Sequence, residues 1–155
     1  MTSGRSVADW VLLSYRLPRE PSTPRIAVWR KLTRLGVARI GDGLVALPAD
    51  ARTREQFEWL AQEIGEHGGD ATTWLGRPLD PGQEEHMIDE LRAARAAEYR
   101  RIADQARVAP PEDQVRVLRR LREELRRIGQ RDFFPPPERD AAEAALRALT
   151  GVEVR

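Results

Sequence analysis

The hydrophobic positions divide the first half of the chain into four short strand-like runs and two helix-like segments. Residues 10–17 form an apolar run that suits a central strand covered on at least one face. Two shorter runs, 37–40 and 44–47, bracket a Gly-Asp-Gly turn at 41–43 and predict a β-hairpin. A fourth strand is predicted over 71–75, where threonine and tryptophan favour extended backbone.

The first helix-like segment carries its own start and stop signals. We expect Thr23 to be the N-cap, with Pro24 at the first helical position and Gly36 ending the helix in a left-handed conformation. At about 100° per residue, one face carries the apolar side chains Val28, Trp29, Leu32 and Leu35, with Arg25 on the same side. The opposite face carries Arg30, Lys31 and Arg34.

The second helix-like segment is expected to begin at Thr53. Thr53 and Gln56 have the spacing of a capping box, in which each side chain satisfies the other residue's free backbone donor. The buried stripe is predicted to be Phe57, Leu60, Ala61 and Ile64. The His-Gly-Gly sequence at 67–69 is expected to end this helix.

The resulting order, β-α-β-β-α-β, predicts an α+β fold. This order commonly forms a four-stranded antiparallel sheet with both helices on one face, the ferredoxin-like plait. Three further helices are predicted, at about 80–107, 112–128 and 138–150. We therefore divide the chain into a plait, residues 1–79, and a C-terminal helical region, residues 80–155, packed on the plait or on a dimer partner.

Within the second of these later helices, the apolar residues have the alternating three- and four-residue spacing of a narrow packing seam. They are Leu118, Leu121, Leu125 and Ile128. Gly129 is expected to end that helix, and the triple proline at 135–137 is expected to form a rigid corner before the last one.

Composition narrows the possible chemistry. The chain has no cysteine, which excludes disulfides, thiolate metal sites and thiol redox reactions. No apolar run approaches the roughly 18–20 residues that a membrane-spanning helix requires, and the N-terminus lacks the hydrophobic segment of a signal peptide. We therefore expect a cytoplasmic protein without a membrane partner.

Charge is unevenly distributed along the chain. The net charge of the 155 residues is +1. By segment it is +6 over 1–39, −9 over 40–90, +6 over 91–131 and −2 over 132–155. Two basic blocks that flank an acidic block favour self-association, here a homodimer, or binding to a polyanion such as DNA. The simpler interpretation is a solvated charged surface.

Catalytic patterns are scarce, so we expect no enzyme, no cofactor and no metal site. His67 and His86 have no partner at metal-ligand spacing, and Ser14 has no neighbouring base. Metal-dependent nucleases of similar outline place an aspartate after the first strand, but the matching stretch here, residues 14–17, has no carboxylate. A nuclease-like enzyme therefore remains only a disfavoured alternative.

Arginine provides the stronger candidates for binding. Four arginines could converge near the N-terminus of the first helix as an oxyanion pocket: Arg16, Arg19, Arg25 and Arg30. The alternative for Arg25 is a side chain packed on Trp29 with its guanidinium paired to a buried carboxylate.

A second set of basic residues could contact DNA phosphates, which would position the protein without reading sequence. The candidates are Arg30, Lys31, Arg34, Arg119, Arg120, Arg126 and Arg127. Glu123 and Glu124 could pair with some of the later arginines on their own helix.

A resemblance to a known family rests on residues spread over most of the chain. The main marks are Leu17-Pro18, Arg25, Trp29-Arg30, Gly36, Asp42-Gly43, Leu47-Pro48 and the Arg-Asp-Phe-Phe-Pro-Pro-Pro-Glu-Arg run at 131–139. Together they resemble the N-terminal domain of ChrB-type chromate-resistance proteins. The hairpin part is also similar to the middle domain of phenylacetate-type repressors.

The resemblance implies a regulator of chromate-export genes that binds DNA and responds to chromate. In that family this domain precedes a second domain, which we expect to be missing here. The chain could then act as a DNA-binding regulator, or as a non-enzymatic interaction module for a separate protein that carries the missing domain. Without cysteine, any contact with chromate must come from arginine and backbone N–H groups.

Overall fold

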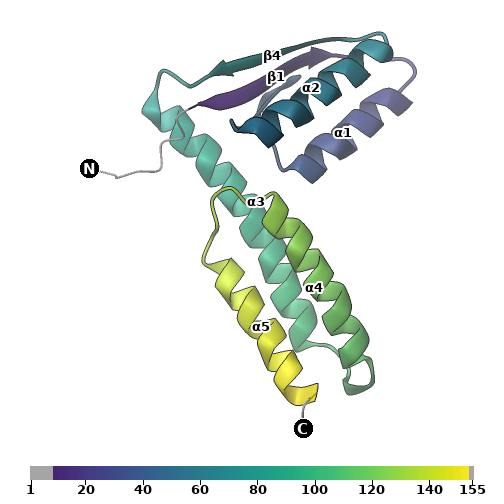
Figure 1. Ribbon diagram of the computed structural model, residues 1–155, viewed down its shortest axis with the longest axis vertical. Helices are drawn as coiled ribbons and strands as arrows, with labels where there is room; N and C mark the ends of the chain where they lie inside the picture. Colours follow the sequence, from purple (N-terminus) through teal and green to yellow (C-terminus); the bar gives the residue numbers. More distant parts are fainter. Residues whose placement is uncertain (1–8, 154–155) are drawn as a thin grey trace. The chain divides into compact units, whose positions relative to one another are not determined.

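A computed structural model of the chain describes residues 9–153 (Figure 1). The elements, in chain order, are β1 (Trp10–Arg16), α1 (Thr23–Leu35), β2 (Ala38–Gly41), β3 (Leu44–Pro48), α2 (Ala51–Glu66), β4 (Asp70–Gly76), α3 (Pro81–Arg107), the short 3-10 helix η1 (Pro111–Asp113), α4 (Gln114–Gln130) and α5 (Glu138–Glu153).

The chain divides into two compact units, Met1–Ile88 and Asp89–Arg155, and the boundary lies within α3. The division expected from the sequence, after residue 79, falls just before α3 begins. The first unit contains the whole sheet together with α1 and α2. The second contains most of α3 with α4 and α5.

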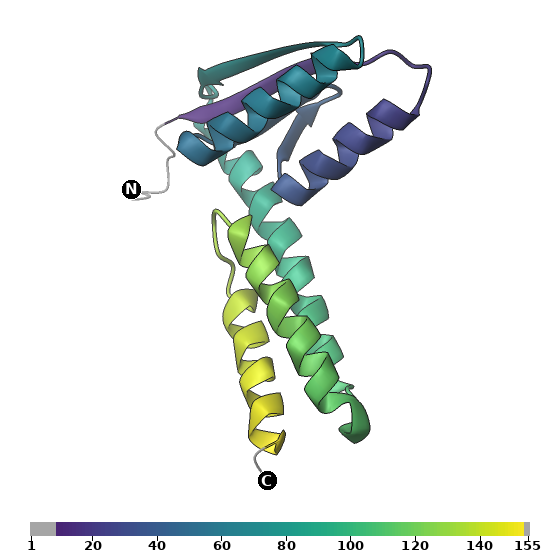
Figure 2. The ribbon, with the colours of Figure 1, turned by 45° about the vertical axis from the view of Figure 1, so that its right-hand side comes forward.

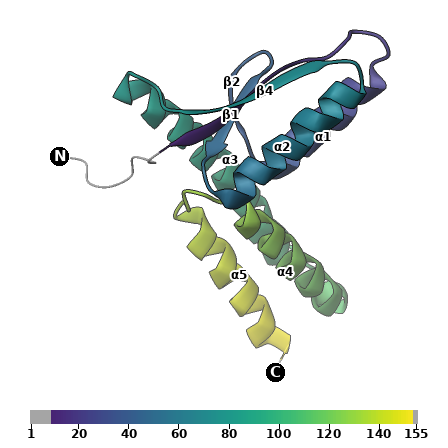
Figure 3. The same cartoon turned by 45° about the horizontal axis from the view of Figure 1, so that its top comes forward.

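The sheet of the first unit has the strand order β2-β3-β1-β4, and every neighbouring pair is antiparallel. Both α1 and α2 lie on the same face of this sheet (Figure 2 and Figure 3). The predicted α+β fold with a ferredoxin-like plait and three C-terminal helices is therefore confirmed. β1 is the central strand expected from its apolar run.

Strand register assigns the side chains of the sheet to two faces. Val11 and Leu13 of β1 lie opposite Leu47 and Val45 of β3, and all four are buried on the face that carries the helices. Trp10, on the other face, is also fully buried. β4, at the edge of the sheet, differs from β1 and β3 because most of its residues are exposed.

Two predicted helix starts were wrong by a short distance. The N-cap of α1 is Ser22 rather than Thr23, and its side chain makes no capping hydrogen bond. α2 begins two residues earlier than expected, because Asp50 is the N-cap and forms the capping box with Thr53. The Thr53 N–H donates to Asp50 Oδ1 at 2.8 Å, so an aspartate two residues after the end of β3 provides the cap that we assigned to Thr53.

The predicted roles of the glycines were correct in part. Gly36 ends α1 with a φ of 74°, as predicted. Gly43 has a φ of 77°, and a Cβ there would lie 2.4 Å from the carbonyl oxygen of Tyr15, so the hairpin turn requires glycine. Gly129 does not end α4, which continues through Gln130. Glycine tolerates helical backbone at a cost of about 1 kcal/mol, so it stops a helix only where positive φ is adopted.

The second unit is a helical assembly in which α3, α4 and α5 run side by side (Figure 1 and Figure 2). Its core joins side chains of all three helices, including Ile102, Leu121 and Leu146. The predicted seam on α4 is confirmed, because Leu118, Leu121 and Ile128 are buried and Leu125 packs against them.

The corner between α4 and α5 is attached to three consecutive residues of α3. Glu98 forms an ion pair with Arg131, the Tyr99 hydroxyl donates to Asp132 at 2.7 Å, and Arg100 pairs with Glu138 at 2.9 Å. Charged residues of the 131–139 run therefore hold the turn to α3. Among the residues that the structure describes, no helix is long and apolar enough to cross a membrane.

Candidate functional site

The most distinctive polar surface of the first unit lies where α1 approaches the β2–β3 hairpin. Arg39 of β2 pairs in register with Val45, which places its side chain on the helix-covered face. Its guanidinium carbon lies 4.2 Å from the centre of the Trp29 ring on α1. Trp29 is 40% exposed, so this cation–π contact is accessible to a ligand.

Tyr15 of β1 completes this surface. Its backbone N–H donates to the carbonyl oxygen of Gly43 at 2.8 Å, which anchors the strand end to the hairpin turn. Burial raises the pKa of the Tyr15 hydroxyl, while Arg39 and Arg25 lower it and Asp42 raises it. Both arginines therefore act electrostatically on the same phenol. We call Tyr15, Arg25, Trp29 and Arg39 the Tyr15 cluster.

The cations of the Tyr15 cluster are not neutralised locally. Within residues 9–153, neither Arg25 nor Arg39 forms an ion pair with a carboxylate, and both side chains are exposed. The predicted pairing of the Arg25 guanidinium with a buried acid is therefore wrong. The Trp29 ring carries the guanidinium of Arg39, because the hairpin register brings that residue beside α1.

The four arginines expected to form an oxyanion pocket do not gather at one point. Arg16 shares the sheet face of Trp10 and Ser14, which is opposite the face of Tyr15 and α1. Arg30 follows Arg25 by five residues, which turns it by roughly 140° around the helix. Arg19 lies exposed in the loop before α1. Only Arg25 therefore lies in the Tyr15 cluster.

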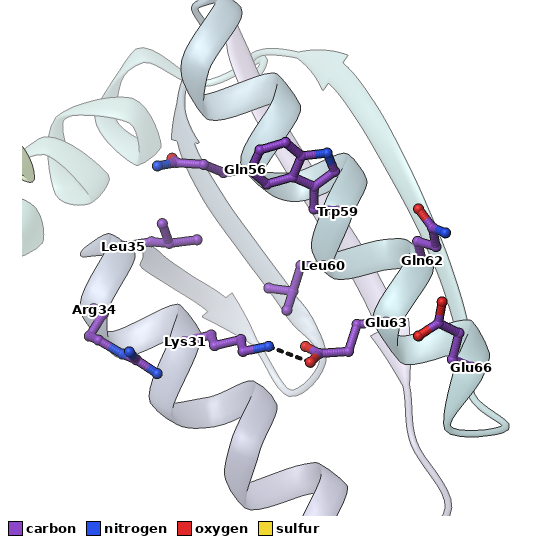
Figure 4. Close-up of a pocket in the computed structure, with 9 residues that line it drawn as sticks. All are labelled: Lys31, Arg34, Leu35, Gln56, Trp59, Leu60, Gln62, Glu63 and Glu66. Carbon is purple, nitrogen blue, oxygen red and sulfur yellow. Dashed lines mark hydrogen bonds and ion pairs between the residues drawn. The ribbon is translucent and has the colours of Figure 1, made fainter.

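The candidate DNA contacts on α1 have different surroundings. Arg30 and Arg34 are exposed and have no ion-pair partner among residues 9–153. Lys31 forms an ion pair with Glu63 of α2 (Figure 4), so its ammonium group is already partly neutralised.

The candidates on α4 are mostly paired within their own unit. Arg126 and Arg127 both contact Glu123, and Arg120 lies 3.8 Å from Glu124. The pKa of Glu123 is lowered, chiefly by the hydrogen bond from Arg126. Arg119 alone among the α4 candidates has no such partner in the described part of the chain. The predicted pairing by Glu123 and Glu124 is thus confirmed.

Sequence reasoning missed Arg39 and the role of Tyr15. It placed Trp29 on an apolar helix face but not as a platform for a cation. Strand periodicity places Arg39 on the face opposite Ala38, but only the register with β3 shows that the helices cover that face. Elsewhere, no three His, Cys, Asp or Glu side chains between residues 9 and 153 are arranged to hold a metal ion.

The fold and this surface define a small arginine-rich α+β protein with a ferredoxin-like sheet, a helical extension and an exposed basic site on its first helix. The sequence model of the family described as "Protein ChrB, N-terminal" matches residues 25–109, more than half of the chain. The chain therefore belongs to the ChrB N-terminal family.

A curated relative supports this assignment. The chain is 29% identical over 143 residues to Protein ChrB of Cupriavidus metallidurans, and the match covers 89% of this chain. It covers 44% of the relative, so the chain spans less than half the length of that protein. No solved structure matches the chain.

Proposed function

We propose that this chain is a non-enzymatic regulator in chromate resistance that binds DNA through the Tyr15 cluster. The observation that carries the proposal is the Arg39–Trp29 stack beside Arg25, exposed and without carboxylate partners in residues 9–153. The family membership supports the connection with chromate resistance.

The chemistry of this surface suits a phosphate backbone. A guanidinium that stacks on an indole keeps its N–H edges free to donate to phosphate oxygens. Arg25, on α1, would add a further phosphate contact. Such contacts orient a protein on the duplex without reading bases, so we expect binding with little sequence preference from this surface alone.

Fluorescence anisotropy with a labelled duplex at several salt concentrations tests the proposal. Wild-type affinity should fall linearly with the logarithm of salt concentration, because released counterions drive phosphate binding. Arg39→Ala and Arg25→Ala should each weaken binding and reduce the salt slope by about one. Arg54→Ala is the matched control, since Arg54 is an exposed arginine of α2 in the same unit and has no ion-pair partner among residues 9–153.

Two results would contradict DNA binding at this surface: no binding by the wild type at low salt, or equal losses in Arg54→Ala and Arg39→Ala. Cleavage of the labelled duplex that requires a divalent metal would overturn the non-enzymatic part of the proposal. Co-purification with a separate chromate-resistance protein, without any DNA binding, would favour the interaction-module alternative.

The same cluster supports a second role as a sensor of an oxyanion such as chromate. Arg25 and Arg39 both act on the half-buried Tyr15 hydroxyl, so a tetrahedral oxyanion could bind between two cations and a phenol donor. A ligand that binds the folded protein more tightly than the unfolded protein raises the melting temperature of the protein. Chromate and sulfate should therefore stabilise the wild type but have a smaller effect on Arg25→Ala, and an undiminished response in that variant would reject the site.

A further inference from the structure

A second surface of the first unit is a groove between the outer sides of α1 and α2 (Figure 4). It has a volume of about 460 Å³, and its walls are formed by Lys31, Arg34, Leu35, Gln56, Trp59, Leu60, Gln62, Glu63 and Glu66. Trp59 is 64% exposed beside the groove, more than either of the other exposed tryptophans. An exposed indole next to an apolar groove is typical of an interaction surface rather than of a solvated helix face.

The charges of this α1–α2 groove are divided between its two walls. Lys31 and Glu63 neutralise each other across it. Arg34 on the α1 wall and Glu66 on the α2 wall are exposed and have no ion-pair partner within residues 9–153. Glu66 is the last residue of α2, where the helix dipole disfavours an acid. One unmatched cation and one unmatched anion therefore remain on opposite walls.

We propose that the α1–α2 groove is the interface of a homodimer. A two-fold axis through the groove places Arg34 of one copy against Glu66 of the other, and the same rotation repeats this pair on the opposite side. Trp59 from each copy becomes buried near the axis.

Charge complementarity favours a second copy over other occupants. A nucleic acid would meet the carboxylate of Glu66, which would repel its phosphates and offset the attraction of Arg34. An unrelated peptide would have to supply both an acid and a base at the correct separation. A second copy supplies both automatically, because the groove carries each charge once. This inference is independent of the proposed DNA binding, which uses the other side of α1.

Sedimentation equilibrium of the full chain gives the dissociation constant of the dimer. Trp59→Ala should weaken association on the order of tenfold or more, as expected for a buried aromatic anchor. Trp74→Ala is the matched control, because Trp74 is 55% exposed on β4, outside the groove. Both changes are at exposed positions, and circular dichroism verifies that each variant is folded.

A charge exchange provides the sharper test. Arg34→Glu and Glu66→Arg should each dissociate the homodimer, since like charges then face each other on both sides. An equimolar mixture of the two variants should recover a heterodimer, because both contacts again join opposite charges.

Three results would overturn the inference: a wild type that remains monomeric at every concentration measured, a mixture that associates no better than either variant, or dissociation by Trp74→Ala and not by Trp59→Ala. Arg39→Ala should remain dimeric even if it loses DNA binding, so the two proposals can fail separately.

Discussion

The two units of the chain use arginine in opposite ways. Near α1, in the unit Met1–Ile88, Arg25, Arg30 and Arg39 are exposed and have no carboxylate partner in the described residues. In the unit Asp89–Arg155, most arginines are paired with acids, and Arg95 is only 7% exposed. The comparison shows that the number of arginines says little about binding. What matters is whether the fold also supplies each one with a partner.

The buried pairs of the second unit have a structural role. Glu98 accepts from Arg95 at 2.5 Å and also pairs with Arg131. Burial lowers the pKa of Arg95, and Glu98 opposes that change. Tyr99, next to Glu98 on α3, donates to Asp132. These residues hold the corner before α5, whereas Arg25 and Arg30 of the first unit have no carboxylate partner among residues 9–153.

The largest expected effect is the loss of Glu98. Glu98→Gln removes the negative charge between two arginines that are largely buried, so both would remain as uncompensated cations. We expect the free energy of unfolding to fall by about 3–5 kcal/mol, measured by chemical denaturation. The matched control is Glu123→Gln, which also pairs with two arginines but lies on the exposed surface of α4 and should change stability little. Equal effects of the two variants would contradict the distinction between buried and exposed pairs.

Tyr99→Phe should have an intermediate effect. It removes the hydrogen bond to Asp132 and leaves a carboxylate without its donor, so we expect a loss of about 1–2 kcal/mol. The pKa of Tyr99 is raised, first by burial and then by Asp132. The folded state therefore retains this proton above pH 10, where the unfolded state loses it, and wild-type stability should decline as pH rises past 10. Denaturation at neutral and alkaline pH should show a smaller decline in Tyr99→Phe; an unchanged decline would mean that other groups are responsible.

The smallest expected effect concerns Tyr15. Burial raises its pKa as well, but Arg39 and Arg25 partly cancel that effect. Tyr15→Phe should therefore reduce the alkaline decline in stability less than Tyr99→Phe does. Arg39→Ala should increase the decline, because one of the opposing cations is lost. Spectrophotometric titration of the tyrosines checks the order directly, and a Tyr15 that ionises at higher pH than Tyr99 would reverse the comparison.

Much of the fold could be predicted because it depends on local patterns. β4 was expected over 71–75 and spans Asp70–Gly76, and α3 begins at Pro81 as its Asp-Pro start signal indicates. The seam of α4 followed from the spacing of its leucines. Helix ends were predicted less well: Thr53 was expected to begin α2, but Asp50 is the N-cap and Thr53 is its partner in the capping box.

The candidate site could be predicted only in part. Arg25 was identified from its place on α1. The predicted convergence of Arg16 and Arg30 with Arg25 was wrong, because the three side chains point in different directions. Arg39 was missed because its contact with Trp29 joins residues on different elements. A bulge between Arg39 and Gly41 interrupts the hairpin register. The order of residues along the chain therefore does not reveal that the Arg39 side chain will contact the Trp29 ring.

The amino-acid sequence by itself determined the order of strands and helices, the family and the excess of arginine, because each of these is a property of neighbouring positions along the chain. Only the tertiary structure decided which arginines are paired and which remain available. That outcome depends on strand register and on the rotation of each side chain about its helix, and both are set when distant elements pack together rather than by any local pattern.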